Sequence, residues 1–106
     1  MGMLLLMGGG SPLILVQPQD ASKAVNETAA FSVTARDARS YQWVISIDGG
    51  QTFEQLPEAT ASSYTTGTLS EFDNGLQFRV LVGNEFGTTH SRAATLTVTG
   101  GGGLPE

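Results

Sequence analysis

Apolar and polar residues alternate along most of this chain, and no window of about eleven residues or more places apolar side chains at the helical spacing i, i+3, i+4 and i+7. In the segment 29–35, Phe31 and Val33 fall on one face, while Ser32 and Thr34 fall on the other. This pattern is typical of an antiparallel strand with one buried face. The sequence therefore predicts an all-β protein without a substantial helix, in which Phe31 and Val33 face the core.

Turn-forming residues divide the chain into short segments. Glycine, proline, asparagine and aspartate recur roughly every ten residues, between runs that are rich in β-branched side chains. About seven or eight short strands at this spacing favour a two-sheet antiparallel sandwich. The expected strands cover residues 13–16, 29–35, 41–47, 51–56, 62–69, 77–83 and 89–99, with a switch segment near residues 22–25.

The strand predicted at residues 41–47 contains the single tryptophan of the chain. Alternation places Trp43 on the same face as Ile45 and Ile47, so Trp43 is expected in the core and not at a ligand. Residues 48–50, Asp-Gly-Gly, tolerate the positive φ angles of a tight turn. We therefore expect the chain to turn back in a hairpin directly after this strand.

Two glycine-rich stretches bracket the segments that alternate. Such stretches commonly behave as flexible linkers, and a chain of 106 residues suffices for one hydrophobic core. We expect a flexible N-terminal tail or linker over residues 1–12, a single domain over residues 13–99, and a Gly-rich C-terminal linker over residues 100–106.

Charge and cysteine content exclude several classes of function. The formal net charge is −5 and no basic cluster is present, so the chain would repel a phosphate backbone, and nucleic acid is not expected as a partner. Without cysteine, neither a disulfide nor a thiolate metal site is available. The apolar run at residues 1–7 is shorter than the ~20 residues of a membrane helix, so no membrane span is expected.

Three pieces of the sequence match the motifs of a known family. Phe31-Ser32-Val33 matches the motif of its second strand, and Tyr41-Gln42-Trp43 supplies the tryptophan of its third strand. The run from Val80 to Gly87 matches the pattern Cys-x-Ala-x-Asn-x-x-Gly, with valine in place of the cysteine. The chain thus resembles immunoglobulin-like domains of the intermediate set and their bacterial relatives. The resemblance implies that Val33 and Val80 stand where the family has its disulfide, beside Trp43.

Two further segments extend this resemblance. Asp73-Asn74-Gly75 followed by Phe78 is similar to the pattern Asp-x-Gly-x-Tyr-x-Cys, with one extra residue and with phenylalanine for tyrosine. The segment 46–53 is similar to a hairpin that is common in bacterial immunoglobulin-like repeats of secreted and surface proteins. The resemblance therefore implies a bacterial or phage source, and it implies a structural core that contains Phe31, Val33, Trp43, Phe78 and Val80.

The chain lacks the usual components of an active site. There is no cysteine nucleophile, no Gly-rich loop that opens a helix, and a single histidine, His90, which falls in or near the last expected strand. Carboxylates near the turns could offer oxygen ligands to calcium, but no Asp-x-Asp-x-Asp loop is present. We therefore expect neither enzymatic activity nor a cofactor or metal site.

Two hypotheses about function remain. The first is a non-catalytic spacer or adhesion module of a larger secreted bacterial or phage protein, located outside the cell, on its surface or in a phage virion. Its partners would be the neighbouring domains of the same polypeptide. The alternative is recognition of a glycan or a surface protein by loops that cluster at one end of the sandwich, with Arg36, Arg39, Asn84 and Phe86 as candidate residues. The isolated domain is expected to be a monomer.

Overall fold

The computed structural model describes residues 10–100, so the first nine residues of the predicted tail and all but residue 100 of the predicted C-terminal linker lie outside the described residues. Within this range the chain forms short β-strands and one 3-10 helix. In chain order they are β1 (Leu13–Val16), β2 (Ala21–Ala24), β3 (Ala30–Ser32), β4 (Thr34–Arg36), β5 (Ser40–Ser46), β6 (Glu54–Gln55), β7 (Ser63–Thr65), η2 (Glu71–Asp73), β8 (Gln77–Asn84), β9 (Gly87–His90) and β10 (Ala94–Thr99).

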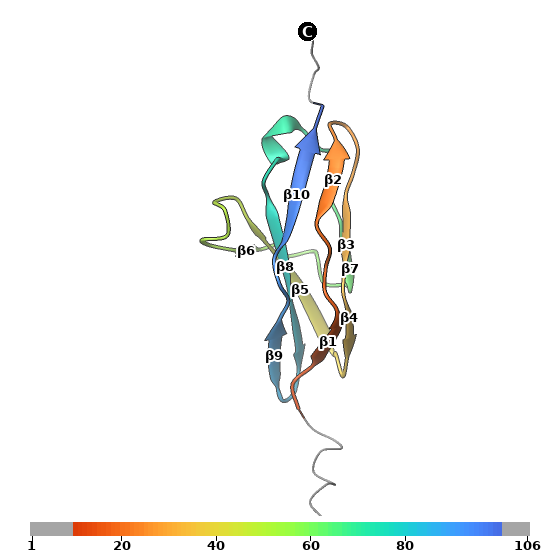
Figure 1. Ribbon diagram of the computed structural model, residues 1–106. Helices are drawn as coiled ribbons and strands as arrows, with labels where there is room; N and C mark the ends of the chain where they lie inside the picture. Colours follow the sequence, from red (N-terminus) through yellow and green to blue (C-terminus); the bar gives the residue numbers. More distant parts are fainter. Residues whose placement is uncertain (1–9, 101–106) are drawn as a thin grey trace, which may run out of the picture.

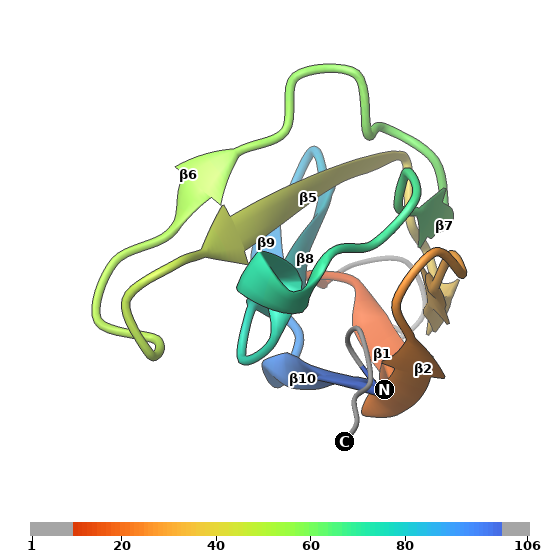
Figure 2. The same cartoon turned by 90° about the horizontal axis from the view of Figure 1, so that it is seen from above.

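The strands build two layers that pack face to face (Figure 1; Figure 2). One layer is a six-stranded sheet in the order β2-β10-β8-β5-β6, with β9 paired to β8. The other layer consists of two strand pairs, β1 with β4 and β3 with β7. The prediction of an all-β two-sheet sandwich is confirmed. One pairing departs from the expected antiparallel order, because β2 runs parallel to β10.

The strand predicted at residues 29–35 is two strands in the structure. β3 pairs with β7, whereas β4 pairs with β1, so the chain changes partner at Val33. The amide of Val33 donates to the Ser62 carbonyl at 3.0 Å instead of joining either ladder. Its side chain is nevertheless only 6% exposed. The alternation that predicted the inward face therefore holds across the break.

The strand predicted at residues 89–99 is also divided, into β9 and β10. At the break, the hydroxyl of Ser91 accepts a hydrogen bond from the Val80 amide at 2.9 Å and donates to the Arg92 carbonyl at 2.7 Å. The Ser91 hydroxyl thus takes the place of a backbone carbonyl as the acceptor for the Val80 amide. After the break, β10 pairs with β8 at Ala94 and Thr95 and with β2 from Leu96 onward. Ser91 is buried at the break although it is polar.

Replacing Ser91 with alanine is expected to lower the free energy of unfolding by about 1–3 kcal/mol, because the buried amide of Val80 would lose its partner. Chemical denaturation followed by circular dichroism measures the change. Replacing the exposed Ser22 of β2 with alanine is the matched control and should change stability by less than about 0.5 kcal/mol. Equal stability of the two variants would show that the Ser91 hydroxyl is not required at the break.

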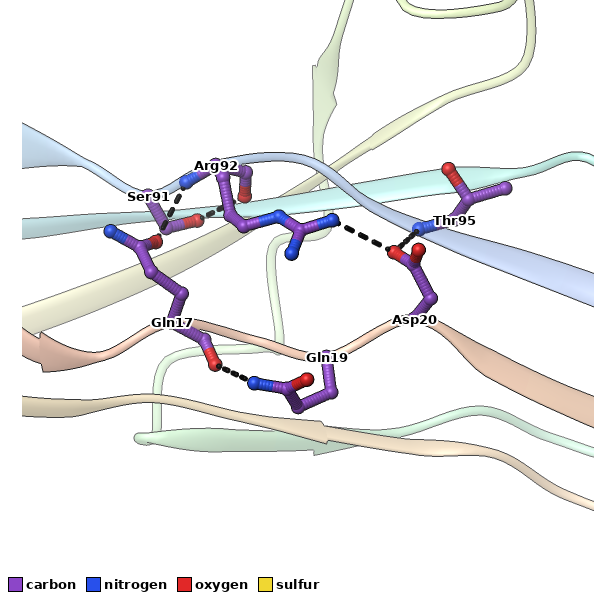
Figure 3. A network of polar contacts seen from close by, with 6 residues as sticks. All are labelled: Gln17, Gln19, Asp20, Ser91, Arg92 and Thr95. Atoms are coloured by element: carbon purple, nitrogen blue, oxygen red, sulfur yellow. Dashed lines mark hydrogen bonds and ion pairs between the residues drawn. The ribbon is translucent and has the colours of Figure 1, made fainter.

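A polar network fastens the segment between β1 and β2 to the last strand (Figure 3). The Gln17 side-chain carbonyl accepts from the Arg92 amide at 2.9 Å. The Asp20 carboxylate accepts from the Thr95 amide at 2.9 Å and from the Arg92 guanidinium at 3.2 Å. This network holds the chain where it crosses from one layer to the other. Sequence reasoning predicted only a switch segment near residues 22–25, whereas the structure shows a strand, β2.

The hairpin after β5 is organised by two side chains. The hydroxyl of Ser46 donates to the Asp48 carboxylate at 2.8 Å and accepts from the Gly50 amide at 2.8 Å. The same carboxylate accepts from the hydroxyl and the amide of Thr52, at 2.6 Å and 2.9 Å. These bonds, first of all the one from the Thr52 hydroxyl, lower the pKa of Asp48 to about 2. The prediction of an inward-facing Ile47 was wrong: β5 ends at Ser46, and Ile47 is 80% exposed.

Two other predicted strands are shorter than expected. The strand predicted at residues 51–56 is limited to β6, because the amides of Gln51 and Thr52 donate to the Asp48 carboxylate of the turn. The strand predicted at residues 62–69 is limited to β7. A turn closes the end of η2, where the Leu76 amide donates to the Asp73 carbonyl at 3.3 Å and Gly75 has a φ of +93°.

The core lies between the two layers. All five residues that were expected in it are buried, and Trp43 and Val80 are fully so. Aromatic rings fill its centre: Phe31 stacks on Phe78 at a centroid distance of 4.8 Å, and Tyr64 lies 5.6 Å from Phe78. The indole N–H of Trp43 donates to the Ala61 carbonyl at 2.8 Å, so the polar atom of this buried side chain is satisfied.

Candidate functional site

Two loops lie side by side at the end of the sandwich where the described chain begins (Figure 1). One joins β4 to β5 and the other joins β8 to β9. The amide of Arg39 in the first loop donates to the Gly83 carbonyl beside the second loop, at 2.8 Å. We call this end of the molecule, formed by residues 37–40 and 84–87, the N-terminal pole.

Asn84 holds the N-terminal pole together. Its side-chain amide donates to the carbonyl of Gly10 at 3.0 Å and to the carbonyl of Asp37 at 2.9 Å. Its side-chain carbonyl accepts from the amides of Phe86 and Gly87, at 2.7 Å and 3.2 Å. All polar atoms of the side chain are therefore engaged within the protein. Asn84 therefore holds in place the turn that carries Phe86.

The other three candidate residues are exposed. Phe86 occupies the two-residue turn between β8 and β9, and its side chain is 55% exposed. Arg39 lies in the neighbouring loop, whereas Arg36 lies further back, in β4. Within residues 10–100, no hydrogen bond or ion pair links either guanidinium group to the loop 84–87. The structure thus brings Arg39, Asn84 and Phe86 to one pole, and their role in binding stays a prediction.

A second candidate surface lies around Tyr64 of β7. Two open hollows share this residue as part of their lining. The first, of about 460 Å³, is lined by residues 56–59 and by Thr65. The second, of about 190 Å³, is lined by residues 66–69 and by Asp73, among others. We call the two hollows together the Tyr64 groove.

The ring of Tyr64 is fixed by the core while its hydroxyl remains unused. The ring lies 6.5 Å from the Trp43 ring and 5.6 Å from the Phe78 ring. Partial burial raises the pKa of Tyr64, and the negative charge of Asp73 raises it further. The phenol is therefore neutral at physiological pH. Among the described residues no hydrogen bond engages its hydroxyl, which is left free to bond to a ligand or to water.

Nothing in the local sequence pattern predicts the Tyr64 groove. Its walls come from the loop after β6, the segment after β7 and the turn after η2, which are separate in the chain. The single local signal is an aromatic residue in a segment that is otherwise rich in serine and threonine. Alternation shows only that Tyr64 faces the same side as the core, and it does not show that the sandwich is open there.

Ion and membrane sites have little support in the described part of the chain. Within residues 10–100, no three His, Cys, Asp or Glu side chains gather in an arrangement that could hold a metal ion. His90 is exposed in β9, opposite Leu81 of β8. No helix of the described residues is long and apolar enough to cross a membrane.

Comparisons with known proteins place the chain in a family and identify its fold. The model of a family described as a domain of unknown function (DUF8696) matches residues 17–100. No curated protein sequence matches the chain.

Solved structures resemble the sandwich closely, although their sequences differ. Tandem Ig repeats of Dlar match with a TM-score of 0.65 and 20% identity, over 83% of this chain and 48% of that one, so the chain spans about half of that structure. A chimeric titin Z1Z2 matches with a TM-score of 0.66 and 17% identity, over 88% of this chain and 98% of that one. Titin M4 matches with a TM-score of 0.64 and 15% identity, over 88% of this chain and the full length of that one. The fold is therefore immunoglobulin-like, as the resemblance implied, and it has no cysteine with which to form a disulfide.

Proposed function

This chain belongs to the family described as a domain of unknown function (DUF8696), and we propose that it is a non-catalytic structural module that holds neighbouring parts of a larger polypeptide apart. Immunoglobulin-like neighbours support a structural or adhesion-type module in general. The more specific role is supported by where the chain enters and leaves the sandwich.

The two ends of the described chain lie at opposite ends of the sandwich (Figure 1). Gly10 is hydrogen-bonded to Asn84 at the N-terminal pole. Thr99 closes β10 at the other end, where its carbonyl accepts from the Val25 amide at 3.1 Å. A domain with this arrangement keeps whatever precedes it and whatever follows it separated by the full length of the sandwich.

β2 and β10 are the first and last strands of the six-stranded sheet in chain order, and their pairing resists separation of the two chain ends. β2 and β10 run parallel, in register from Ala21 opposite Leu96 to Ala24 opposite Thr99. A pull on the two chain ends draws these strands past each other along their length. All hydrogen bonds of the pair, which lie across the pulling direction, then share the load at once. This pairing is the observation that carries the proposal.

The proposal also covers the parent protein, its location and the oligomeric state of the domain. We infer a parent that is a secreted bacterial or phage polypeptide, located outside the cell, on its surface or in a virion, with the folded module over residues 13–99. A monomer fits the edge strand β1, which is only four residues long and has a register shift between Ile14 and Val16. Pro12 and Pro18 flank it. Short, bulged edges next to proline disfavour pairing between chains, although Leu13 and Leu15 of this strand are half exposed.

The separation of the ends can be measured by single-molecule energy transfer between dyes at Ser11 and Gly100. We expect one narrow population whose transfer efficiency is lower than that of a dye pair at one end of the domain and does not change with salt concentration. Dyes at Glu85, in the N-terminal pole, and at Ser11, which lies beside Gly87, form the matched control and should show high efficiency. A broad population, or a close approach of Ser11 and Gly100 in the folded domain, would contradict the role as a spacer.

Recognition through the N-terminal pole is the second candidate function, and it is favoured by the exposed ring of Phe86 on a turn that Asn84 holds in place. If this surface binds a glycan or a protein, Phe86→Ala should weaken binding on a glycan array or to a surface extract. The unfolding free energy should change by less than about 1 kcal/mol, because Phe86 lies on a surface turn and about half of it is exposed to solvent. Unchanged binding by the folded variant would remove Phe86 from the site.

A further inference from the structure

We propose that the Tyr64 groove is a binding site for a neutral saccharide chain. The groove is distinct from the N-terminal pole, and the proposal does not depend on the role as a spacer. The larger hollow, of about 460 Å³, lies within the range of about 300–1,000 Å³ that is usual for small-ligand sites.

Tyr64, which lines both hollows, contributes an aromatic ring that the core holds in place. The Tyr64 ring is packed against Trp43 and Phe78, so it needs no reordering when a ligand arrives. Rigid aromatic side chains supply contact area at a low entropic cost. Leu56, Pro57 and Ala59 continue the apolar surface on one side. A flat ring beside small apolar residues suits the C–H faces of a pyranose.

The rim of the groove carries oxygen atoms that suit sugar hydroxyl groups. The Tyr64 hydroxyl is neutral and takes part in no hydrogen bond among the described residues. Thr65 and Thr68 add hydroxyl groups, one in each hollow. Ligand sites that combine an apolar floor with a few such polar groups gain their orientation and specificity from the polar groups.

The charge of the groove excludes anionic ligands. The carboxylates in its lining are Glu58 in the larger hollow and Asp73 in the smaller one, and no lysine or arginine lines either hollow. The chain as a whole has a formal net charge of −5. Sulfated, sialylated or uronic-acid chains would therefore be repelled. Carboxylates accept hydrogen bonds from neutral sugar hydroxyls, so these two residues favour a neutral saccharide.

The test is a titration of ¹⁵N-labelled protein with cellohexaose, laminarihexaose and maltohexaose, and with hexagalacturonate as the anionic control. We expect at least one neutral hexasaccharide to produce saturable shifts of the backbone amides of Leu56, Glu58 and Ala59 and of residues 64–69. Hexagalacturonate should produce none. Shifts centred on residues 84–87, or no saturable shift with any of the three neutral chains, would overturn the proposal.

Tyr64→Phe gives the sharper test, because it removes only the free hydroxyl and leaves the ring in the core. We expect this variant to bind the active hexasaccharide roughly two- to tenfold more weakly, as is usual for the loss of one hydrogen bond. Tyr41→Phe, on β5 and outside the lining of both hollows, is the matched control and should bind as the parent does. Equal affinity of Tyr64→Phe and the parent would show that the hydroxyl does not contact the saccharide.

Discussion

Replacing Trp43 with alanine is expected to lower the free energy of unfolding by about 3–5 kcal/mol. The side chain is fully buried, and the substitution removes its contact with Tyr64 and its hydrogen bond to the Ala61 carbonyl. Because no disulfide reinforces this core and domains of this size have a margin of about 5–15 kcal/mol, part of the population is expected to unfold at physiological temperature.

Denaturation has to be followed by far-ultraviolet circular dichroism, because Trp43 is the single tryptophan and its fluorescence is lost in the variant. Phe72→Ala is the matched aromatic control. Its ring is 86% exposed on η2, so its removal should cost less than about 1 kcal/mol. If Trp43→Ala unfolds at the same denaturant concentration as the parent, the packing of the core is not as the structure describes it.

The second large effect is expected when cysteine replaces both Val33 and Val80. These side chains come from opposite layers and both belong to the core cluster around Trp43. If their Cα atoms lie within the limit of about 7 Å for a disulfide, oxidation should join them. Closing a loop of this length should stabilise the domain by on the order of 4 kcal/mol in the chain-entropy model, minus any strain.

Thiol titration of the folded protein measures bridge formation, and denaturation of the oxidised and reduced forms measures the gain. The double replacement of Val33 and Leu81 is the matched control, since Leu81 is the neighbour of Val80 in β8 and points to the opposite face of the strand. That pair should keep both thiols free. Free thiols in the folded Val33/Val80 variant would show that the two valines do not stand at the positions of the family's disulfide.

Local patterns predicted several of the side chains that face the core. Alternation placed Phe31, Val33 and Trp43 on inner faces, and all three are buried. The turn after Ser46 was also predictable, because Asp48, Gly49 and Gly50 suit a tight hairpin whatever surrounds them. Such predictions succeed because each depends on neighbours within a few residues of the chain.

Features that depend on distant partners were not predictable. The break at Val33 exists because β3 and β4 pair with different strands. The break at Ser91 exists because its hydroxyl bonds to Val80, and the parallel pairing of β2 is set by β10. Ile47 was placed wrongly because nothing in the alternation shows where a strand ends. The Tyr64 groove was not predicted, because its walls come from segments that are far apart in the sequence.

The central claim is that this domain is a spacer in which the pairing of β2 with β10 resists separation of the chain ends. It is tested most directly by pulling single molecules in two directions. A pull through Ser11 and Gly100 draws β2 and β10 past each other and loads all their hydrogen bonds together. A pull through Asn26 and Gly100 acts at the adjacent ends of the same two strands, beside the bond from Val25 to Thr99, and opens the pair one bond at a time. We predict that the first direction requires a several-fold higher unfolding force than the second, at the same loading rate. Equal forces in the two directions would contradict the claim.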